Sequence, residues 1–160
     1  MLTVRSLLLG FAFALAALLP AAGQPGSGGD AQKLVGVWRL VSITTDGQVN
    51  PLRGGKPTGF IFYTAAGDMG VLIQPERPPI AMAGKELTGA EALAALQGYS
   101  AYFGTYTVDE KAKIVTHHRT GNVQPGAEVD AQRRYRFEPG DRLVLGGVGT
   151  KNQNVWERIK

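Results

Sequence analysis

His117 and His118 are the only histidines in the chain, and histidine is the side chain that most readily exchanges a proton near neutral pH. Adjacent residues of a β-strand point to opposite faces, so at most one of them faces an interior, and the two cannot chelate one metal ion. Alternation places Thr116 with His118 and His117 with Arg119. Because Arg119 prefers water, we expect His118 to face inward, as a general base or a hydrogen-bonding group. If Arg119 instead lies at an open end of the fold, where it can reach water, His117 would face inward.

Four aromatic residues are candidates for the wall of an internal cavity: Phe60, Phe62, Tyr102 and Tyr106. Tyr102 and Tyr106 share one face of a predicted strand. Inward tyrosines combine an apolar ring with a hydroxyl group that can anchor a ligand. Packing in a filled core is the alternative role for these rings.

Arg133 is the candidate for recognition of a negative charge. It shares a strand face with Tyr135 and Phe137, so if that face points inward the guanidinium is buried and needs a partner. The partner would be the carboxylate of a ligand or an internal acid such as Glu157. An arginine at the rim or on the surface is the alternative.

Several other kinds of chemistry lack the residues that they need. The chain has no cysteine, which excludes disulfides, thiolate metal sites and thiol nucleophiles. It has no Gly-x-Ser-x-Gly turn, and no glycine-rich phosphate loop precedes a helix. The net charge is +4, and the positively charged residues are scattered apart from Arg133, Arg134 and Arg136, so nucleic acid is an unfavourable partner. We expect no metal and no cofactor.

The elements that would position these side chains are short β-runs separated by turn residues. Consecutive antiparallel strands can close on themselves, which removes exposed sheet edges. We therefore predict an all-β fold, an eight-stranded antiparallel up-and-down barrel with one short helix; an open sandwich is the alternative. The second and third runs are close enough to form a hairpin. The eight runs are residues 34–44, 58–64, 69–74, 100–108, 113–120, 131–138, 142–145 and 154–159.

One helix is predicted over residues 88–97. Thr88 and Glu91 have the spacing of a capping box, Leu93 and Leu96 follow on one face, and Gly98 ends the run. We expect this helix to pack against the sheet as a lid or plug; whether it moves stays open.

The N-terminal segment has the composition of an export signal. Arg5 precedes an uncharged apolar run over residues 7–19, and small residues follow up to Gly23. This order is typical of a secretory signal peptide, here cleaved after Gly23. The run is shorter than the roughly 20 residues that span a bilayer, which disfavours an uncleaved anchor. We expect a signal peptide (1–23), a flexible leader (24–32) and a barrel domain (33–160) that is secreted or periplasmic, with no stable membrane anchor.

Several stretches of the chain resemble the bacterial and fungal lipocalin-like domain family, and the resemblance covers about residues 33–159. It implies a small up-and-down barrel with a cavity, and it implies no particular activity. Relatives in the wider calycin group bind small apolar molecules, and some similar barrels catalyse cyclisations. The matching stretches are residues 34–42 with Gly36-x-Trp38, 59–69, 99–106, 115–118, 133–137 and 156–158.

The Gly36-x-Trp38 pair has a structural role in this interpretation. A tryptophan at the start of the first strand can seal one end of a barrel, and the missing side chain of Gly36 allows close approach of another group. Arg158, near the end of the chain, is the candidate to stack on the indole of Trp38.

Three functions fit these features. The first is an exported carrier that holds a small, largely apolar or amphipathic molecule, with the four aromatic residues as wall and one polar anchor. The second is an isomerase or cyclase that uses the same cavity, with His118 or a tyrosine as acid or base. The third is a barrel filled by its own side chains, with a structural or interaction role. We favour the carrier because acid–base residues are few.

Overall fold

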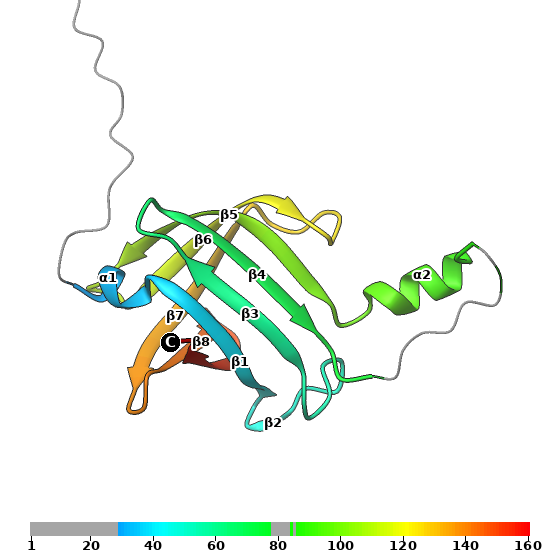
Figure 1. Cartoon of the computed structure of the whole chain (residues 1–160), viewed down its shortest axis with the longest axis horizontal. Coiled ribbons are helices and arrows are strands. Elements are labelled where there is room, and N and C mark those ends of the chain that lie inside the picture. Colours follow the sequence, from blue (N-terminus) through cyan, green and yellow to red (C-terminus); the bar gives the residue numbers. More distant parts are fainter. Residues whose placement is uncertain (1–28, 78–83, 85) are drawn as a thin grey trace, which may run out of the picture.

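The computed structural model describes residues 29–77, 84 and 86–160, and it places their strands in one antiparallel sheet (Figure 1). The sheet order is β2-β1-β3-β4-β5-β6-β7-β8-β9, and β1 also pairs with β9. Eight long strands thus close a barrel, while the short strand β2 forms a hairpin arm on β1. The predicted eight-stranded antiparallel up-and-down barrel is confirmed.

The strand bounds follow the predicted runs closely. The predicted hairpin is the β3–β4 pair, which is registered from Thr58 opposite Gln74 to Tyr63 opposite Met69. Only β2 has no counterpart among the predicted runs. The strands are β1 (Gly36–Thr45), β2 (Gln48–Val49), β3 (Thr58–Tyr63), β4 (Asp68–Gln74), β5 (Ser100–Asp109), β6 (Ile114–Asn122), β7 (Asp130–Glu138), β8 (Arg142–Gly147) and β9 (Asn152–Arg158).

The core lies inside the barrel and is built from alternate positions of the strands, as the pleat requires. In β3, for example, Ile61 and Tyr63 are buried, whereas the neighbouring Phe60 and Phe62 are exposed. The buried cluster is continuous around the barrel and comprises Leu34, Trp38, Leu40, Ile43, Ile61, Tyr63, Met69, Val71, Ile73, Tyr106, Val115, Tyr135, Leu143, Leu145 and Trp156.

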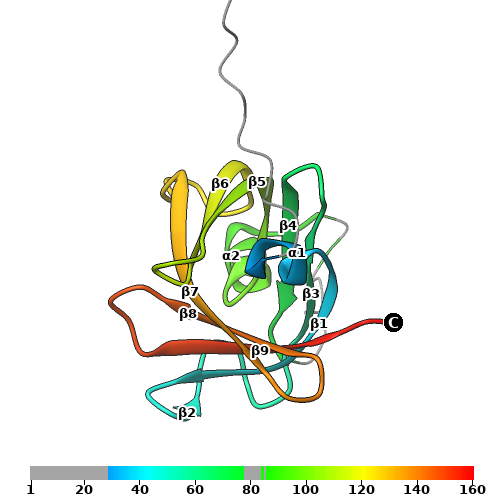
Figure 2. The same ribbon diagram turned by 90° about the vertical axis from the view of Figure 1, so that its left-hand side faces the viewer.

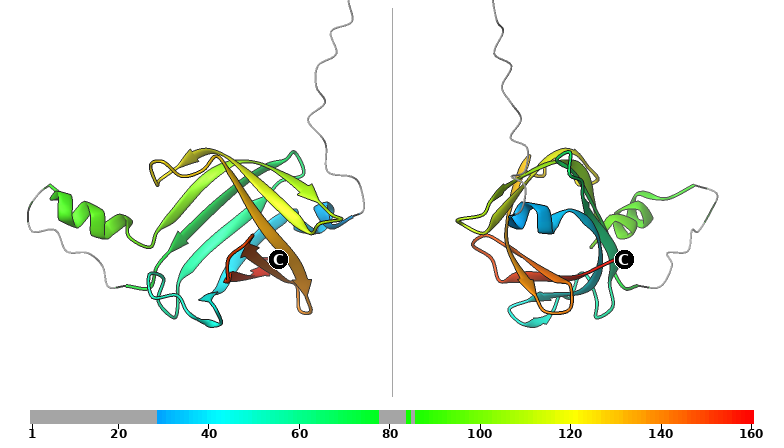
Figure 3. Two further views of the ribbon diagram at one scale, coloured as in Figure 1. Left: turned by 180° about the vertical axis from the view of Figure 1, so that it is seen from behind. Right: turned by 60° about the vertical axis from the view of Figure 1, so that its left-hand side comes forward.

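One end of the barrel is closed by the short helix α1 (Asp30–Leu34), which lies across the ring of strands (Figures 2 and 3). The indole N–H of Trp38 donates to the carbonyl of Leu34 at 2.8 Å, and the Arg158 guanidinium lies 4.0 Å from the Trp38 ring centroid. The predicted stacking of Arg158 on Trp38 is confirmed. Gly36 has a φ of 136°, and a Cβ there would lie 2.6 Å from the Arg158 guanidinium, so the seal requires glycine.

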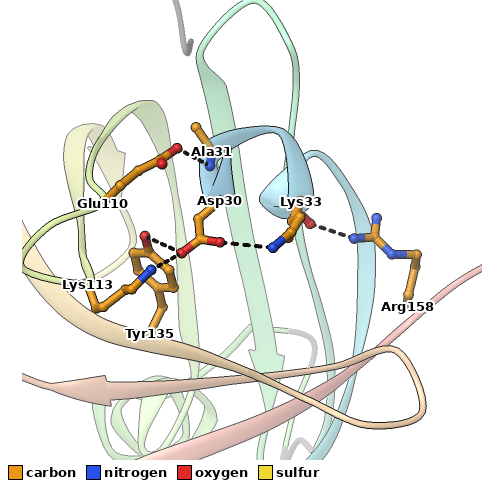
Figure 4. A network of polar contacts seen from close by, with 7 residues as sticks. All are labelled: Asp30, Ala31, Lys33, Glu110, Lys113, Tyr135 and Arg158. Carbon is orange, nitrogen blue, oxygen red and sulfur yellow. Dashed lines mark hydrogen bonds and ion pairs between the residues drawn. The ribbon is translucent and has the colours of Figure 1, made fainter. Parts of the chain in front are cut away.

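The helix α1 begins at Asp30, before the predicted start of structure near Leu34. Its anchor is the Asp30 carboxylate, which accepts from Lys33 and from the Tyr135 hydroxyl, each at 3.2 Å, and pairs with Lys113 (Figure 4). A helix of five residues has little stability of its own, so these contacts with distant strands hold it in place. The residues of α1 alone therefore did not indicate a helix.

The helix α2 (Gly89–Leu96) has the predicted capping box. The Glu91 N–H donates to the Thr88 hydroxyl at 3.3 Å, and the Thr88 N–H donates to the Glu91 carboxylate at 2.7 Å. However, α2 projects away from the barrel at the end opposite α1, and none of its residues is buried (Figure 1). The expectation that it packs against the sheet is wrong; Leu93, the centre of its apolar face, is 72% exposed.

The contact that holds α2 is polar. The Arg77 guanidinium donates to the carbonyls of Ala94, Ala95 and Gln97. These are the carbonyls that a helix leaves unsatisfied at its C-terminus, and a cation is favourable there. The predicted end of the helix is confirmed by Gly98, which takes a φ of 75° directly after it. Within the described residues, no helix is long and apolar enough to cross a membrane.

Candidate ligand-binding cavity

A cavity of about 290 Å³ lies inside the barrel and opens at the end opposite α1. Its mouth is formed by residues next to the ends of β1 and β8 and the starts of β5 and β9. Its apolar wall consists of Ile43, Ile61, Val71, Ile73, Leu145 and Trp156, and its polar lining consists of Asn50, Arg53, Ser100, Tyr102, His117, Arg133, Thr150, Asn152 and Asn154.

His117 is the buried polar side chain at the centre of the barrel, with 1% of its surface exposed. Its Nε2 lies 2.8 Å from the Tyr63 hydroxyl and its Nδ1 lies 3.0 Å from the Tyr102 hydroxyl. Burial lowers the pKa of His117 to about 3, and the positive charges of Arg133 and Arg119 act in the same direction. The imidazole is therefore neutral at physiological pH.

A neutral imidazole has one N–H donor and one acceptor nitrogen, so one tyrosine donates to His117 and the other accepts from it. Tyr63 is fully buried, and its hydroxyl contacts no other group than His117 among the hydrogen bonds of the described residues. Its hydroxyl hydrogen is satisfied only if Tyr63 donates to Nε2. Nδ1–H then donates to Tyr102, and the Tyr102 O–H is left to donate into the cavity.

Two guanidinium groups line the cavity together with these residues. Arg53 follows β2 and donates to the carbonyl of Gly98 and, at 2.7 Å, to the hydroxyl of Ser100. Burial lowers the pKa of Arg53. Arg133 reaches inward from β7. Tyr102 lines the same cavity; burial raises the pKa of Tyr102, and the positive charge of Arg133 and its hydrogen bond to the tyrosine oppose that rise.

Neither arginine is neutralised by a carboxylate. No aspartate or glutamate is part of the cavity lining, and the ion pairs of the described residues include neither Arg53 nor Arg133. Glu157, the partner considered for Arg133, instead pairs with Arg39 on the outside of the barrel, with Oε1 2.9 Å from Nε of Arg39. The cavity is therefore electropositive.

The indole of Trp156 adds an unsatisfied donor. Trp156 lines the cavity with 1% of its surface exposed, and its Nε1 has no hydrogen-bond partner among the described residues. A buried N–H without a partner destabilises the folded state by about 1–3 kcal/mol, so such groups normally have a role or a bound partner. Trp156 belongs to the wall of the cavity, and its Nε1 is buried within that wall.

The structure corrects the expected orientation of the histidines. His118 faces outward, where it contacts the Thr107 hydroxyl at 2.9 Å and Asp130 at 2.8 Å, and His117 faces inward. Arg119, in the same row as His117, is half-buried beside the ring of Tyr102, and its Nε is buried without a partner among the described residues, so this strand tolerates a partly buried cation.

Phe60 and Phe62 were expected inside and are in fact outside. They are 46% and 41% exposed and do not line the cavity. Every residue from Phe60 to Tyr63 is apolar or aromatic, so the alternation does not reveal which row is inside. The glycines decide it: a Cβ at Gly70, the cross-strand partner of Phe62, would lie 2.4 Å from the Phe62 ring. The ring covers this glycine on the outer face.

Tyr102 and Arg133 lie in the cavity lining, as their positions in the sequence suggested, but Tyr106 does not. Tyr106 packs in the core against Tyr63, with ring centroids 4.8 Å apart, and its hydroxyl donates to the carbonyl of Thr64 at 2.9 Å. It therefore has the alternative role considered above, core packing.

Sequence reasoning missed most of the polar lining, including Arg53, and it missed Trp156 in the wall. Trp156 could have been found, since it alternates with Asn154 on the last strand and both face inward. Arg53 lies in a loop between β2 and β3, and no periodicity indicates the direction of a loop side chain. Among the described residues, no group of three histidine, aspartate, glutamate or cysteine side chains is placed to hold a metal ion.

A closed antiparallel barrel with a plugged end and an open-ended internal cavity defines a class of proteins associated with the binding of small molecules. The chain belongs to the lipocalin-like domain family, whose sequence model matches residues 35–158. No curated protein matches the chain.

Proposed function

We propose that this protein is an exported carrier that binds a small, largely apolar molecule in its barrel cavity. The observation that carries the proposal is the cavity itself, about 290 Å³ with an apolar wall, polar groups near the mouth and a plug at the far end. This combination of an apolar wall with a few placed polar groups is typical of small-molecule sites.

Binding fits the geometry better than proton transfer. An isomerase or cyclase in this cavity needs an acid–base pair that can reach its substrate. The one histidine that faces inward has both ring nitrogens engaged by Tyr63 and Tyr102, and burial holds its pKa far below neutrality. Burial also raises the pKa of Tyr102, which makes its hydroxyl a hydrogen-bond donor rather than a base.

Export is the second part of the proposal and rests on residues 1–23, which lie outside the described residues. The charged start, apolar run and small-residue end support cleavage after Gly23 and a secreted or periplasmic protein.

Native mass spectrometry of the protein from the exported fraction, compared with a denatured sample, tests both parts. A protein that begins at Gln24 and carries a small molecule lost on denaturation is the expected result. An uncleaved protein retained in the membrane fraction would contradict export.

The neutral dye N-phenyl-1-naphthylamine tests binding independently of co-purification, because its fluorescence rises in an apolar site. We expect saturable binding that a bulky residue in the cavity wall, Val71→Trp, abolishes. The matched control is Phe60→Ser on the outer face, which should leave binding unchanged. A folded protein that does not bind the dye would contradict the carrier function.

A further inference from the structure

The charged groups of the cavity lining are all positive. Arg53 and Arg133 line it as cations with no carboxylate in the lining. Because His117 accepts from Tyr63 and donates to Tyr102, the Tyr102 O–H is left to donate into the cavity. Acceptors in the lining are confined to neutral amide and hydroxyl groups, which can also donate.

Such an arrangement is unfavourable in the empty protein. Arg53 loses hydration through burial, which lowers its pKa, and neither Arg53 nor Arg133 finds a carboxylate in the cavity lining. The side-chain contacts of Arg53 are to a carbonyl and a hydroxyl, which satisfy hydrogen bonds but do not compensate the charge. An anion in the cavity would compensate the charge of both arginines.

We propose that the ligand is an organic anion, an apolar body with one carboxylate or sulfonate group, and that Arg53 and Arg133 hold its charged group. This inference rests on the proposed function, and it specifies the chemical class of the molecule. The apolar body would lie against Ile61, Val71 and Ile73, which line the same cavity.

The orientation of the neighbouring arginine provides an internal control. Arg134 is the next residue of β7 and points outward, so it carries the same charge on the same strand without reaching the cavity. A general effect of protein charge on an anionic ligand would be equal for Arg133 and Arg134. Binding inside the cavity would depend on Arg133 alone.

A matched pair of dyes tests the proposal. N-phenyl-1-naphthylamine is neutral, and 1-anilinonaphthalene-8-sulfonate has the same aromatic framework with one sulfonate. We expect the anionic dye to bind at least about tenfold more tightly than the neutral dye. Arg53→Met and Arg133→Met should each weaken the anionic dye by about tenfold and leave the neutral dye within about twofold. Arg134→Met should change neither, and Arg133→Lys should lose less than Arg133→Met because it keeps the charge.

The outcomes separate the two proposals. If both dyes bind equally, or if Arg133→Met and Arg134→Met weaken the anionic dye equally, the anion site is overturned while the carrier function stands. If neither dye binds to the folded protein, both proposals fail. Because the outer face also presents Phe60, each dye is titrated against Phe60→Ser as well; loss of the anionic dye in that variant would place it outside the barrel and overturn the anion site.

Discussion

The environment of His117 makes its proton affinity a property of the folded state. The imidazole is buried between two tyrosine hydroxyls, with Arg133 and Arg119 adding positive charge, and its pKa falls from 6.5 to about 3. In the unfolded chain the same side chain titrates near 6.5. Between these two values the unfolded state binds a proton that the folded state does not, so stability depends on pH in that window.

We predict that His117 destabilises the folded protein as the pH falls from about 6.5 towards 3. The folded pKa is depressed, so the contribution is fully present above 6.5 and is lost as the pH decreases, by about 1.4 kcal/mol per pH unit. The free energy of unfolding in urea, measured from pH 7 to pH 4, should therefore decline more steeply in the wild type than in His117→Leu.

His118→Leu is the control for this measurement. It removes a histidine from the outer face of the same strand and leaves His117 in place, so the decline that depends on His117 should persist in this variant. A His117→Leu profile parallel to the wild type would mean that the buried imidazole is protonated in the folded state.

For single residues, the sequence identified some members of the cavity lining, but it did not fix which face of a strand points inward. Arg133 and Tyr102 line the cavity, and each shares its strand face with a buried tyrosine, Tyr135 and Tyr106 respectively. His117 and Phe60 were assigned to the wrong faces. In β3 and in β6, the residues on the two faces of the strand do not differ clearly in polarity. Which face points inward depends on neighbouring glycines and on the barrel rim, and these are features of the assembled sheet.

The two helices show opposite relations between local sequence and tertiary contact. The helix α1 has five residues, no side-chain cap, and buried Ala31 and Leu34. The helix α2 has a complete capping box and no buried residue. Local signals therefore identified α2 and its bounds, whereas α1 depends on contacts with the β5–β6 turn and with β7, which adjacent residues do not encode.

We predict that α2 contributes little to the stability of the barrel. Leu93→Ala should change the free energy of unfolding by less than about 0.5 kcal/mol, since the side chain is largely exposed. Leu143→Ala is the matched substitution in the core, where the side chain is fully buried, and it should destabilise by about 2–5 kcal/mol. Urea unfolding checks both values, and a large effect at Leu93 would show that α2 packs on the barrel.

The whole molecule has a single core that runs from the plugged end to the cavity. Trp38 lies beneath α1 and Trp156 lies in the cavity wall, and both belong to the same buried cluster. The eight long strands were predictable because turn residues separate apolar runs at regular spacing. The cavity was less predictable from the sequence, because its size depends on how the interior side chains fill the barrel.

We predict that both ends of the barrel unfold in one transition. In Trp38→Phe the fluorescence reports the cavity wall, and in Trp156→Phe it reports the plugged end. Within each variant, the urea midpoint from fluorescence should equal the midpoint from far-ultraviolet circular dichroism, because a continuous core of this size unfolds cooperatively. An earlier fluorescence midpoint in Trp38→Phe would indicate that the cavity end opens separately.

The seam between β1 and β9 joins the first and last strands of the chain, from Trp38 opposite Arg158 to Thr45 opposite Asn152. Pairing over such a sequence distance is slow compared with hairpin formation. During synthesis, β1 has no partner on that side until the final strand emerges from the ribosome. A chain exported as proposed therefore has no closed barrel until β9 is available, and an open chain is the state that a narrow translocation channel can thread.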